Sequence, residues 1–419
     1  MEQVDVLVIG GGPAGLAVSH ELTAAGTTHI VVERGRVGES WRTRWDSFCL
    51  VTPNWKLQLP GGAYAGPDPD GFLERDAIVG YLERYASGFH APVREGVTIT
   101  SLEPGADGGF VARSPAGDLD ARRVVVATGT FREPLVPAEA ASLPAGLPTL
   151  DATGYRNPSE LPSGRLLIVG SGQTGCQVAE ELTEAGREVV LACGKAPWVP
   201  RRINGRDIVW WALESGFLDQ GASALPSPMA RLGANLLASG HGGGHDLHLR
   251  TLQAMGITLA GRFLRAEGGT AVFAPDLAAS IAWGDDRYRD LRGLFTRFAS
   301  ERGIAAPEMP DPVQFVDPGP ERVDLDGVGA VTFTGGFRPG YASWIRLPDA
   351  FDPMGFPIQV DGASSAWPGL HFVGAHFQRK RKSSVILGMG EDASIVARAI
   401  AGASGQGPVA QGSFGRVGK

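Results

Sequence analysis

The sequence predicts an α/β protein with two parallel-sheet domains, the second inserted in the first, and three observations support this prediction. A strand-loop-helix-strand pattern occurs twice along the chain. The length of 419 residues exceeds the roughly 100 to 200 residues of one ordinary domain. Two Pro-rich passages, at residues 134–162 and 307–320, interrupt the chain where crossings between domains would fall.

The two copies of the pattern match in detail. The first spans residues 4–33 and the second spans residues 165–192, and each has an apolar strand, a Gly-rich loop, a helix and a second strand. Four glycines recur 160 positions later, with Gly10, Gly12, Gly15 and Gly26 matched by Gly170, Gly172, Gly175 and Gly186. We therefore expect two Rossmann-like βαβ units.

Each Gly-rich loop follows a strand and opens a helix, which is the context of a dinucleotide-binding loop. Its glycines allow a tight turn, close approach of a pyrophosphate and close packing of helix on strand, and the helix N-terminus favours negative charge. A plain Gly-rich turn without a ligand is the alternative. The predicted cofactor-binding residues are Gly10, Gly12, Pro13, Ala14 and Gly15 in the first loop, and Gly170, Gly172, Gln173, Thr174 and Gly175 in the second.

The residues after each second strand differ between the copies. Glu33 stands 23 positions after Gly10, near the spacing of a carboxylate that accepts from an adenosine ribose hydroxyl, and its neighbour Arg34 is included in this predicted site. The equivalent position in the second copy is Cys193, which cannot repel a 2′-phosphate. The second loop is therefore predicted to prefer NADPH, with phosphate bound by at least one of the cations that follow, Lys195, Arg201 and Arg202. A solvated basic patch is the alternative for these cations.

The Pro-rich passages give the predicted domain boundaries. The first domain takes residues 1–155 and 323–419, and the inserted domain takes residues 156–322.

Composition excludes several classes of function. A net charge of −7 gives no bulk attraction to nucleic acid or to an anionic membrane, and neither partner is expected. The N-terminus runs directly into an apolar strand without a signal peptide, so we expect a cytoplasmic protein. The three cysteines form no Cys-x-x-Cys pair, and the histidines at 241, 245 and 248 are interpreted as a solvated loop, so no metal is predicted.

Several motifs outside the loops are similar to a known family. The segments 38–47, 52–53, 59–61, 126–129, 200–211, 334–339 and 381–393 resemble the bacterial branch of the class B flavin-dependent monooxygenases, relatives of the plant indole-3-pyruvate monooxygenases. The resemblance spans nearly the whole chain. It implies an FAD-binding domain at 1–155 and 323–419, split around an NADPH-binding domain at 156–322.

The resemblance also implies an activity. NADPH would reduce FAD, O2 would add to the reduced ring, and a flavin C4a-hydroperoxide would oxygenate a small organic substrate. Asn54 is the candidate catalytic residue, as a donor to the peroxide or to NADP⁺. Further cofactor-binding residues are implied at Ser40, Trp41, Trp45, Thr128, Gly129, Gly336, Gly374 and Gly390, the last near the start of a C-terminal helix.

Other functions stay open at this stage. An NAD(P)H-dependent flavoprotein reductase or dehydrogenase without oxygen transfer needs the same two loops, and so does a non-catalytic redox sensor. A disulfide reductase is disfavoured because no Cys-x-x-Cys pair is present. The expected reactants are a small molecule and O2, and a homodimer is one open assembly state.

Overall fold

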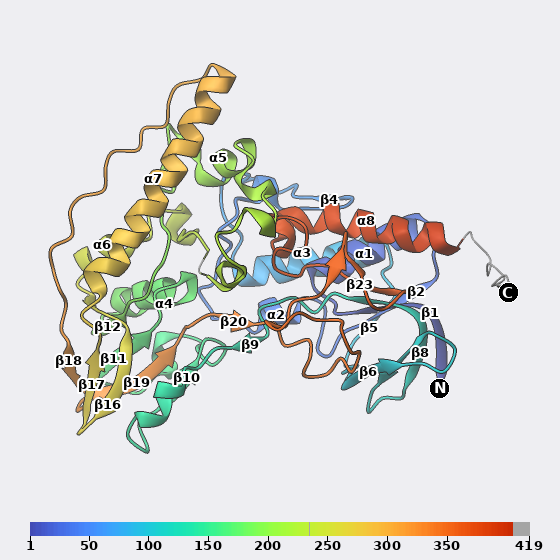
Figure 1. Cartoon of the computed structure of the whole chain (residues 1–419), viewed down its shortest axis with the longest axis horizontal. Helices are drawn as coiled ribbons and strands as arrows, with labels where there is room; N and C mark the ends of the chain where they lie inside the picture. The colour runs from blue at the N-terminus through green and yellow to red at the C-terminus, as the bar shows by residue number, and fades with distance from the viewer. Residues whose placement is uncertain (234, 405–419) are drawn as a thin grey trace, which may run out of the picture.

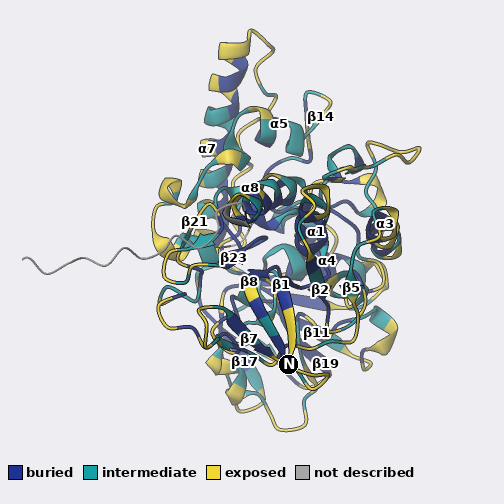
Figure 2. Cartoon of the chain, turned by 90° about the vertical axis from the view of Figure 1, so that its right-hand side faces the viewer, coloured by how far each residue is buried: buried dark blue, intermediate teal, exposed yellow. Residues whose placement is uncertain are grey.

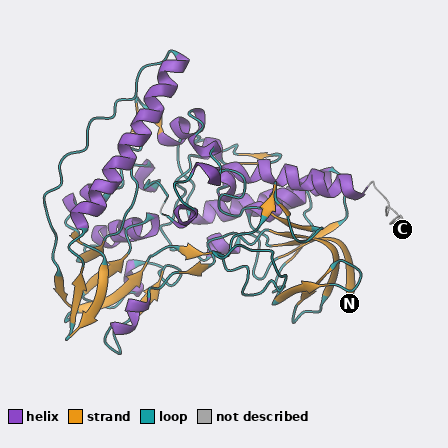
Figure 3. Cartoon of the chain, viewed as in Figure 1, coloured by secondary structure: helices purple, strands orange, loops and turns teal. Residues whose placement is uncertain are grey.

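The computed structural model describes residues 1–233 and 235–404. Two sheets, one parallel at its centre with antiparallel strands attached and one parallel throughout, each have helices packed against them and are joined side by side (Figures 1 and 3). Figure 2 shows buried residues concentrated in the strands and the helices that pack on them, with exposed residues mainly in the surrounding loops. Cys49, Cys176 and Cys193 are buried free thiols. Within the described ranges, no helix combines the length and apolar character needed to span a bilayer.

The first sheet draws strands from both ends of the chain. Its central order is β23-β8-β1-β2-β5, all parallel, and β1 pairs with both β2 and β8. The strands of this sheet are β1 (Glu2–Ile9), β2 (His29–Val32), β5 (Val93–Arg94), β6 (Ser101–Pro104), β7 (Phe110–Arg113), β8 (Leu119–Val126), β21 (Gln359–Val360), β22 (Ala363–Ser364) and β23 (Leu370–Phe372). Residues of α1 (Pro13–Ala24), α3 (Arg75–Gly88) and α8 (Ile386–Ser404) share one apolar core with this sheet.

The second sheet is parallel throughout, in the order β10-β19-β11-β12-β15. Its strands are β10 (Thr149–Asp151), β11 (Arg165–Val169), β12 (Val189–Ala192), β15 (Thr258–Ala260) and β19 (Val328–Phe333). Beside it lies an antiparallel sheet of β16 (Phe263–Glu267), β17 (Thr270–Phe273) and β18 (Arg322–Asp324). The helices of this half of the molecule are α4 (Gln173–Glu184), α5 (Ile208–Glu214), α6 (Leu249–Ala254) and α7 (Leu277–Arg302).

The range 156–322 predicted for the inserted domain is too short to contain the whole second sheet. Both β10 and β19 lie outside the range 156–322, yet they pair with each other and β19 pairs with β11. The two crossings between the sheets instead run side by side as an antiparallel ribbon of β9 (Glu133–Pro134) and β20 (Phe337–Arg338). The inserted body, defined by its strands, therefore runs from β10 to β19.

The start of the C-terminal helix differs from its sequence interpretation, and the basic run that precedes it has acidic partners. The helix expected near Gly390 begins four residues earlier, at Ile386. The basic run at 379–382 is largely neutralised, because Arg379 pairs with Asp361 and Asp392, and both lysines pair with Asp219 and Glu391.

Candidate functional site

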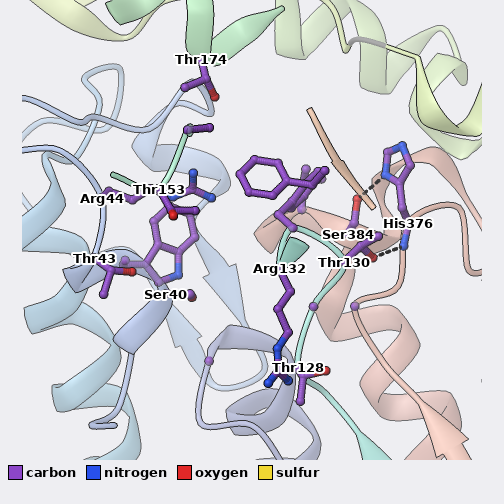
Figure 4. Close-up of a pocket in the computed structure, with 18 of the residues that line it drawn as sticks. Ser40, Thr43, Arg44, Thr128, Thr130, Arg132, Thr153, Thr174, His376 and Ser384 are labelled. Carbon is purple, nitrogen blue, oxygen red and sulfur yellow. Dashed lines mark hydrogen bonds between the residues drawn. The ribbon is translucent and has the colours of Figure 1, made fainter. Parts of the chain in front are cut away.

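A single cavity of about 980 Å³ reaches both Gly-rich loops. It opens at the carboxyl ends of the parallel strands, where α/β folds bind ligands. Figure 4 shows Ser40, Thr43, Arg44 and Thr153 on one side of it, and Thr130, His376 and Ser384 on the other. The predicted site residues that line it are Gly10, Gly12, Pro13, Ala14, Glu33, Arg34, Ser40, Trp41, Trp45, Thr128, Gly129, Gly170, Gly172, Gln173, Thr174, Lys195, Gly336 and Gly374.

The backbone of each loop requires glycine at its first position. Gly10 has φ 115° and Gly170 has φ 116°, a conformation that L side chains rarely adopt. A Cβ at Gly10 would also lie 2.7 Å from the carbonyl oxygen of Ala127, and one at Gly170 would lie 2.8 Å from that of Thr334.

The two helices start in the same way. Gly12 and Gly172 are the N-cap residues of α1 and α4, both in extended backbone and without a side-chain cap. The first-turn N–H groups of both helices are therefore left without side-chain partners at the cavity, as an anion site requires.

Gly15 and Gly175 do not line the cavity, and they serve the close packing of helix on loop that the glycines of this motif allow. A Cβ at Gly15 would lie 1.9 Å from the carbonyl oxygen of Gly10, and one at Gly175 would lie 1.9 Å from that of Gly170. Glycine at these positions lets each helix approach its loop.

Glu33 closes the first loop from the end of β2. Its Oε2 accepts from the N–H of Gly11 at 2.7 Å, and its Oε1 accepts from the N–H of Gly35 at 3.0 Å. A Cβ at Gly11 would lie 2.9 Å from the Cβ of Glu33, so the loop has room for the carboxylate only because residue 11 is glycine. Each carboxylate oxygen keeps a further lone pair for a ligand hydroxyl.

The second loop is closed by a hydroxyl group instead. Ser171 Oγ accepts from the N–H of Gly194 at 3.0 Å and donates to the carbonyl oxygen of Gly194 at 3.1 Å. Cys193 holds the place of Glu33, since its N–H donates to the next strand as that of Glu33 does. Its side chain is fully buried, so the cavity at this point is lined by Gly194 and Lys195.

Two of the three predicted phosphate-binding cations point elsewhere. Arg201 is buried against Asp207 with Nη2 to Oδ2 at 2.7 Å, and it donates from Nη1 to the carbonyl oxygen of Val51 at 2.8 Å. Arg202 donates to the carbonyl oxygens of Gly243 and Gly244. Neither arginine lines the cavity, so their inclusion among the cofactor-binding residues is corrected, and the prediction that at least one of the three cations binds a phosphate depends on Lys195, which lines the cavity.

Asn54 and Gly390 also lie outside the cavity lining. The amide of Asn54 donates to the carbonyl oxygen of Asp68 at 2.9 Å and accepts from the N–H of Leu73 at 2.9 Å. The side chain thus joins two parts of the loop before α3, and its predicted role as a catalytic donor is corrected to a structural one. Gly390 lies against Pro60, since a Cβ there would approach the proline ring to 3.3 Å.

Sequence reasoning missed most of the positive charge in the cavity. The described lining holds two carboxylates, Glu33 and Glu39, and seven cations, Arg34, Arg44, Lys56, Arg132, Arg156, Lys195 and Arg231. Arg44 makes no side-chain hydrogen bond or ion pair with any described residue, and burial lowers the pKa of its guanidinium. A cavity of this charge in a chain of net charge −7 suits polyanionic ligands. Arg44 belongs to the 38–47 motif, and this membership was the feature of the sequence that could have identified it as a site residue.

His376, which the sequence did not indicate as a site residue, lies beyond the end of β23. The Nδ1 of His376 is 2.8 Å from Ser384 Oγ, and its backbone N–H donates to Thr130 Oγ1 at 2.8 Å (Figure 4). Burial, reinforced by the charges of Arg231 and Arg381, lowers the pKa of His376 to about 4. The ring that lines the cavity is therefore neutral at pH 7.

The motif-based resemblance can be compared directly with known proteins. A family model described as pyridine nucleotide-disulphide oxidoreductase matches residues 7–207. A CzcO-like oxidoreductase of Geobacillus kaustophilus (strain HTA426), described as uncharacterized, is 33% identical over 94% of this chain and 97% of its own length. The indole-3-pyruvate monooxygenase YUCCA4 of Oryza sativa subsp. japonica is 26% identical over 91% of this chain and 84% of its own. The chain belongs to the class B flavin-dependent monooxygenase family. The resemblance inferred from the motifs is confirmed.

Solved structures show the same fold. The flavin-containing monooxygenase of Stenotrophomonas maltophilia matches with a TM-score of 0.68 at 19% identity, over 96% of this chain and all of that one. The bacillithiol disulfide reductase Bdr of Staphylococcus aureus matches with a TM-score of 0.63 at 13% identity, over 96% of this chain and 99% of that one. The fold is thus an α/β flavoprotein fold that serves more than one reaction.

Two residues of the cavity lining have buried polar atoms that a bound ligand could satisfy. The Oγ1 of Thr128 and the Nε1 of Trp41 are buried without a hydrogen-bond partner among the described residues, although both side chains line the cavity. Polar atoms left this way are costly unless a ligand or water satisfies them. Together with the two open helix N-termini, they show that the residues present fit dinucleotide cofactors.

Proposed function

We propose that this chain is a monooxygenase that binds FAD in the first body and NADPH in the inserted body, and transfers one oxygen atom from O2 to a small organic substrate. The observation that carries the proposal is the single cationic cavity shared by both loops. Two cofactors that must exchange a hydride need such a common space. The flavin would supply the oxygen chemistry, as a C4a-hydroperoxide formed after its reduction.

The first loop supports FAD. Glu33 is placed to accept from a ribose hydroxyl, and Arg34 lines the cavity beside it. The apolar residues Val97, Ile99 and Trp344 line the cavity as well and offer a surface for an adenine ring. The first turn of α8 contributes Ile386 and Met389 to the lining, so the positive end of this helix favours negative charge on a reduced ring.

The second loop supports NADPH. Ser171 and Gly194 put no carboxylate where a 2′-phosphate would lie, and Lys195 faces the cavity there. Lys195 makes no ion pair with a described residue, so its charge is available to a phosphate.

The chain itself would orient the reactants and exclude water. Trp45 is buried and packs edge-on against Phe48 at 4.9 Å between ring centroids, and both line the cavity. The neutral ring of His376, held by Ser384, offers its Nε2 to a reacting group without adding charge.

A flavoprotein reductase without oxygen transfer is the second candidate. The matched family model and the fold of the bacillithiol disulfide reductase favour it. A cysteine-dependent disulfide reductase has no support here, because the three cysteines are buried and none of them is part of the described cavity lining.

The deciding experiment follows the oxygen. Enzyme reconstituted with FAD and reduced anaerobically by NADPH is mixed with ¹⁸O2 and a panel of amines, sulfides, ketones and organic acids. Monooxygenase activity gives one ¹⁸O atom per product molecule by mass spectrometry. Reduction of the flavin by NADPH with only H2O2 formed, and rapid electron transfer to quinones, would support the reductase instead. A cytoplasmic location and a homodimer remain predictions, the second testable by light scattering.

A further inference from the structure

Arg231 is an arginine of the cavity wall that the two cofactor loops do not use. It lies in the short 3-10 helix Pro228–Leu232 and reaches across to the C-terminal part of the chain. Its Nη1 is 3.3 Å from Asp352 Oδ2, and its Nη2 donates to the carbonyl oxygen of His376 at 3.2 Å. Its guanidinium lies 3.7 Å from the ring centroid of Phe356, and its side chain is only 14% exposed.

The guanidinium is not fully satisfied by these contacts. Arginine has five N–H donors, and the two bonds to Asp352 and His376 use two of them. Its Nε has no partner among the described residues. Asp352 is shared, because its Oδ1 accepts from the N–H groups of Met354 and Phe356, each at 2.9 Å.

The charge balance around Arg231 is positive. Burial lowers the pKa of its guanidinium even though Asp352 opposes the shift. Arg381 adds a second cation near His376, stacked 4.2 Å from the centroid of Phe217 and without an acidic partner among the described residues. Asp352 pairs with Arg231, and Arg381 adds a second positive charge on the His376 side. Buried cations in excess are costly unless an anion joins them.

We propose that Arg231 binds the carboxylate of the substrate, so that the enzyme oxygenates organic acids with an apolar body. This inference rests on the proposed monooxygenase function. The surrounding wall fits such a body, since Phe131, Leu232 and Phe356 line the same cavity. When Ser384 donates to Nδ1 of His376, the Nε2 of that ring carries the proton and donates to the same carboxylate.

A phosphate of NADPH is the other anion that could bind Arg231. The chain that follows Arg231 reaches the second loop, where Ala238 contacts Gln173 through both its N–H and its carbonyl. The position of Arg231 favours the substrate. It is fixed by His376 and Phe356, which belong to the first body, whereas the second loop presents its own cation in Lys195.

The test compares acids with their neutral amides on FAD-loaded enzyme. Phenylacetate, 4-phenylbutanoate and octanoate are each paired with the corresponding primary amide, and Kd is measured by calorimetry and by perturbation of the flavin spectrum. We expect at least one acid to bind about 10-fold or more tighter than its amide, as a charge-assisted bond provides. Arg231→Gln should remove this difference, Arg231→Lys should retain part of it, and the Kd of NADPH should change less than about 2-fold in both.

Arg206→Gln is the matched control, because Arg206 also stacks on an aromatic ring, 3.9 Å from the centroid of Trp210, but does not line the cavity. It should keep the preference for the acid. Equal binding of every acid and amide to the wild type, or no binding of any acid, overturns the proposal. Weaker NADPH binding in Arg231→Gln with an unchanged acid preference assigns the arginine to the cofactor and also overturns it. Flavin reduction by NADPH and ¹⁸O transfer are measured in parallel, so failure of the proposed function is read separately. If Arg231→Gln fails to fold, Arg231→Lys decides.

Discussion

The two Gly-rich loops have the same backbone but are closed by different groups. In the first, the carboxylate of Glu33 bridges the N–H groups of Gly11 and Gly35. In the second, the hydroxyl of Ser171 makes both bonds to Gly194. The residue type at positions 11 and 171 decides which group closes the loop. Glycine at position 11 leaves room for the carboxylate, since a Cβ there would collide with Glu33, whereas Ser171 supplies its own hydroxyl.

This difference separates holding a turn from selecting a ligand. A hydroxyl closes the turn as well as a carboxylate does, but it leaves no negative charge at the place where a ribose substituent lies. One fold can therefore accept an unmodified ribose at one site and a 2′-phosphorylated ribose at the other through a few residues. Changes in each body should then affect one cofactor and leave the other.

The largest expected effect concerns the cation that follows the second loop but does not serve it. Arg201→Gln should lower the free energy of unfolding by about 3 to 5 kcal/mol, because Asp207 would stay buried without its partner. Burial raises the pKa of Asp207 and lowers that of Arg201, which shows that each charged group has lost hydration and depends on the other for stabilisation. Urea denaturation measures the loss. The exposed pair Arg165–Glu188 is the control, and Arg165→Gln should cost less than about 1 kcal/mol. A change in the NADPH preference of Arg201→Gln would contradict its structural role.

The second prediction separates the two sites through Gly12. A Cβ at Gly12 meets no atom within 4 Å and its backbone is extended, so Gly12→Val should fold. Its side chain would occupy the space of the pyrophosphate, and FAD affinity should fall at least ~100-fold, about 2.7 kcal/mol. Flavin content and fluorescence titration measure it. Gly88→Ala, also in open space but at the end of α3, should remain yellow. Normal flavin content in folded Gly12→Val would remove FAD from the first loop.

The third prediction concerns the second site alone. Lys195→Gln should reduce the preference for NADPH over NADH, because it removes a charge-assisted bond to the 2′-phosphate. The expected fall in the ratio of the two kcat/KM values corresponds to about 1 to 3 kcal/mol. The flavin content should not change. Steady-state kinetics with both cofactors measure the ratio, and Arg202→Gln is the control because Arg202 bonds Gly243 and Gly244 away from the cavity. A wild type that prefers NADH would contradict the assignment.

The smallest effect compares the two bodies in acid. Burial lowers the pKa of His371 and His376 in the first body, and of His248 in the second, to about 4. Between pH 6.5 and 4 the unfolded chain therefore binds protons that the folded chain does not, so stability is complete above this window and falls as the pH drops through it. From pH 7 to 6 the loss should be about 0.7 kcal/mol for each histidine. His371→Leu should reduce the pH dependence by that amount in urea denaturation, and an unchanged slope would show that His371 titrates normally.

The sequence predicted the two βαβ units but not their limits. Strand, loop and helix are local patterns, and they were interpreted correctly. The Pro-rich passage was interpreted as a crossing, yet it contains β10, an edge strand. Proline lacks an N–H but keeps its carbonyl, and Pro148 accepts from the N–H of Val331 at 2.9 Å just before that strand. Prolines therefore mark a sheet edge here as well as a linker.

The site was predicted where the backbone carries it, and less well where orientation decides. Lys195, Arg201 and Arg202 look alike in sequence. Asp207 and the carbonyls of Gly243 and Gly244 determine which of them turns away from the cavity, and the sequence does not show those contacts. Asn54 was wrong for the same reason, because Asp68 and Leu73 occupy its amide.

The packing of α1 against α8 affects how the protein is made (Figure 1). The two helices belong to one core but are separated by most of the chain, so a ribosome releases the second long after the first. The middle body is complete in sequence before α8 appears, and once folded it holds β9 and β20 side by side. The ends of the first body are then joined by a compact spacer, which lowers the entropy lost on closing so long a loop. We therefore expect the outer body to close more readily once the inserted body has folded.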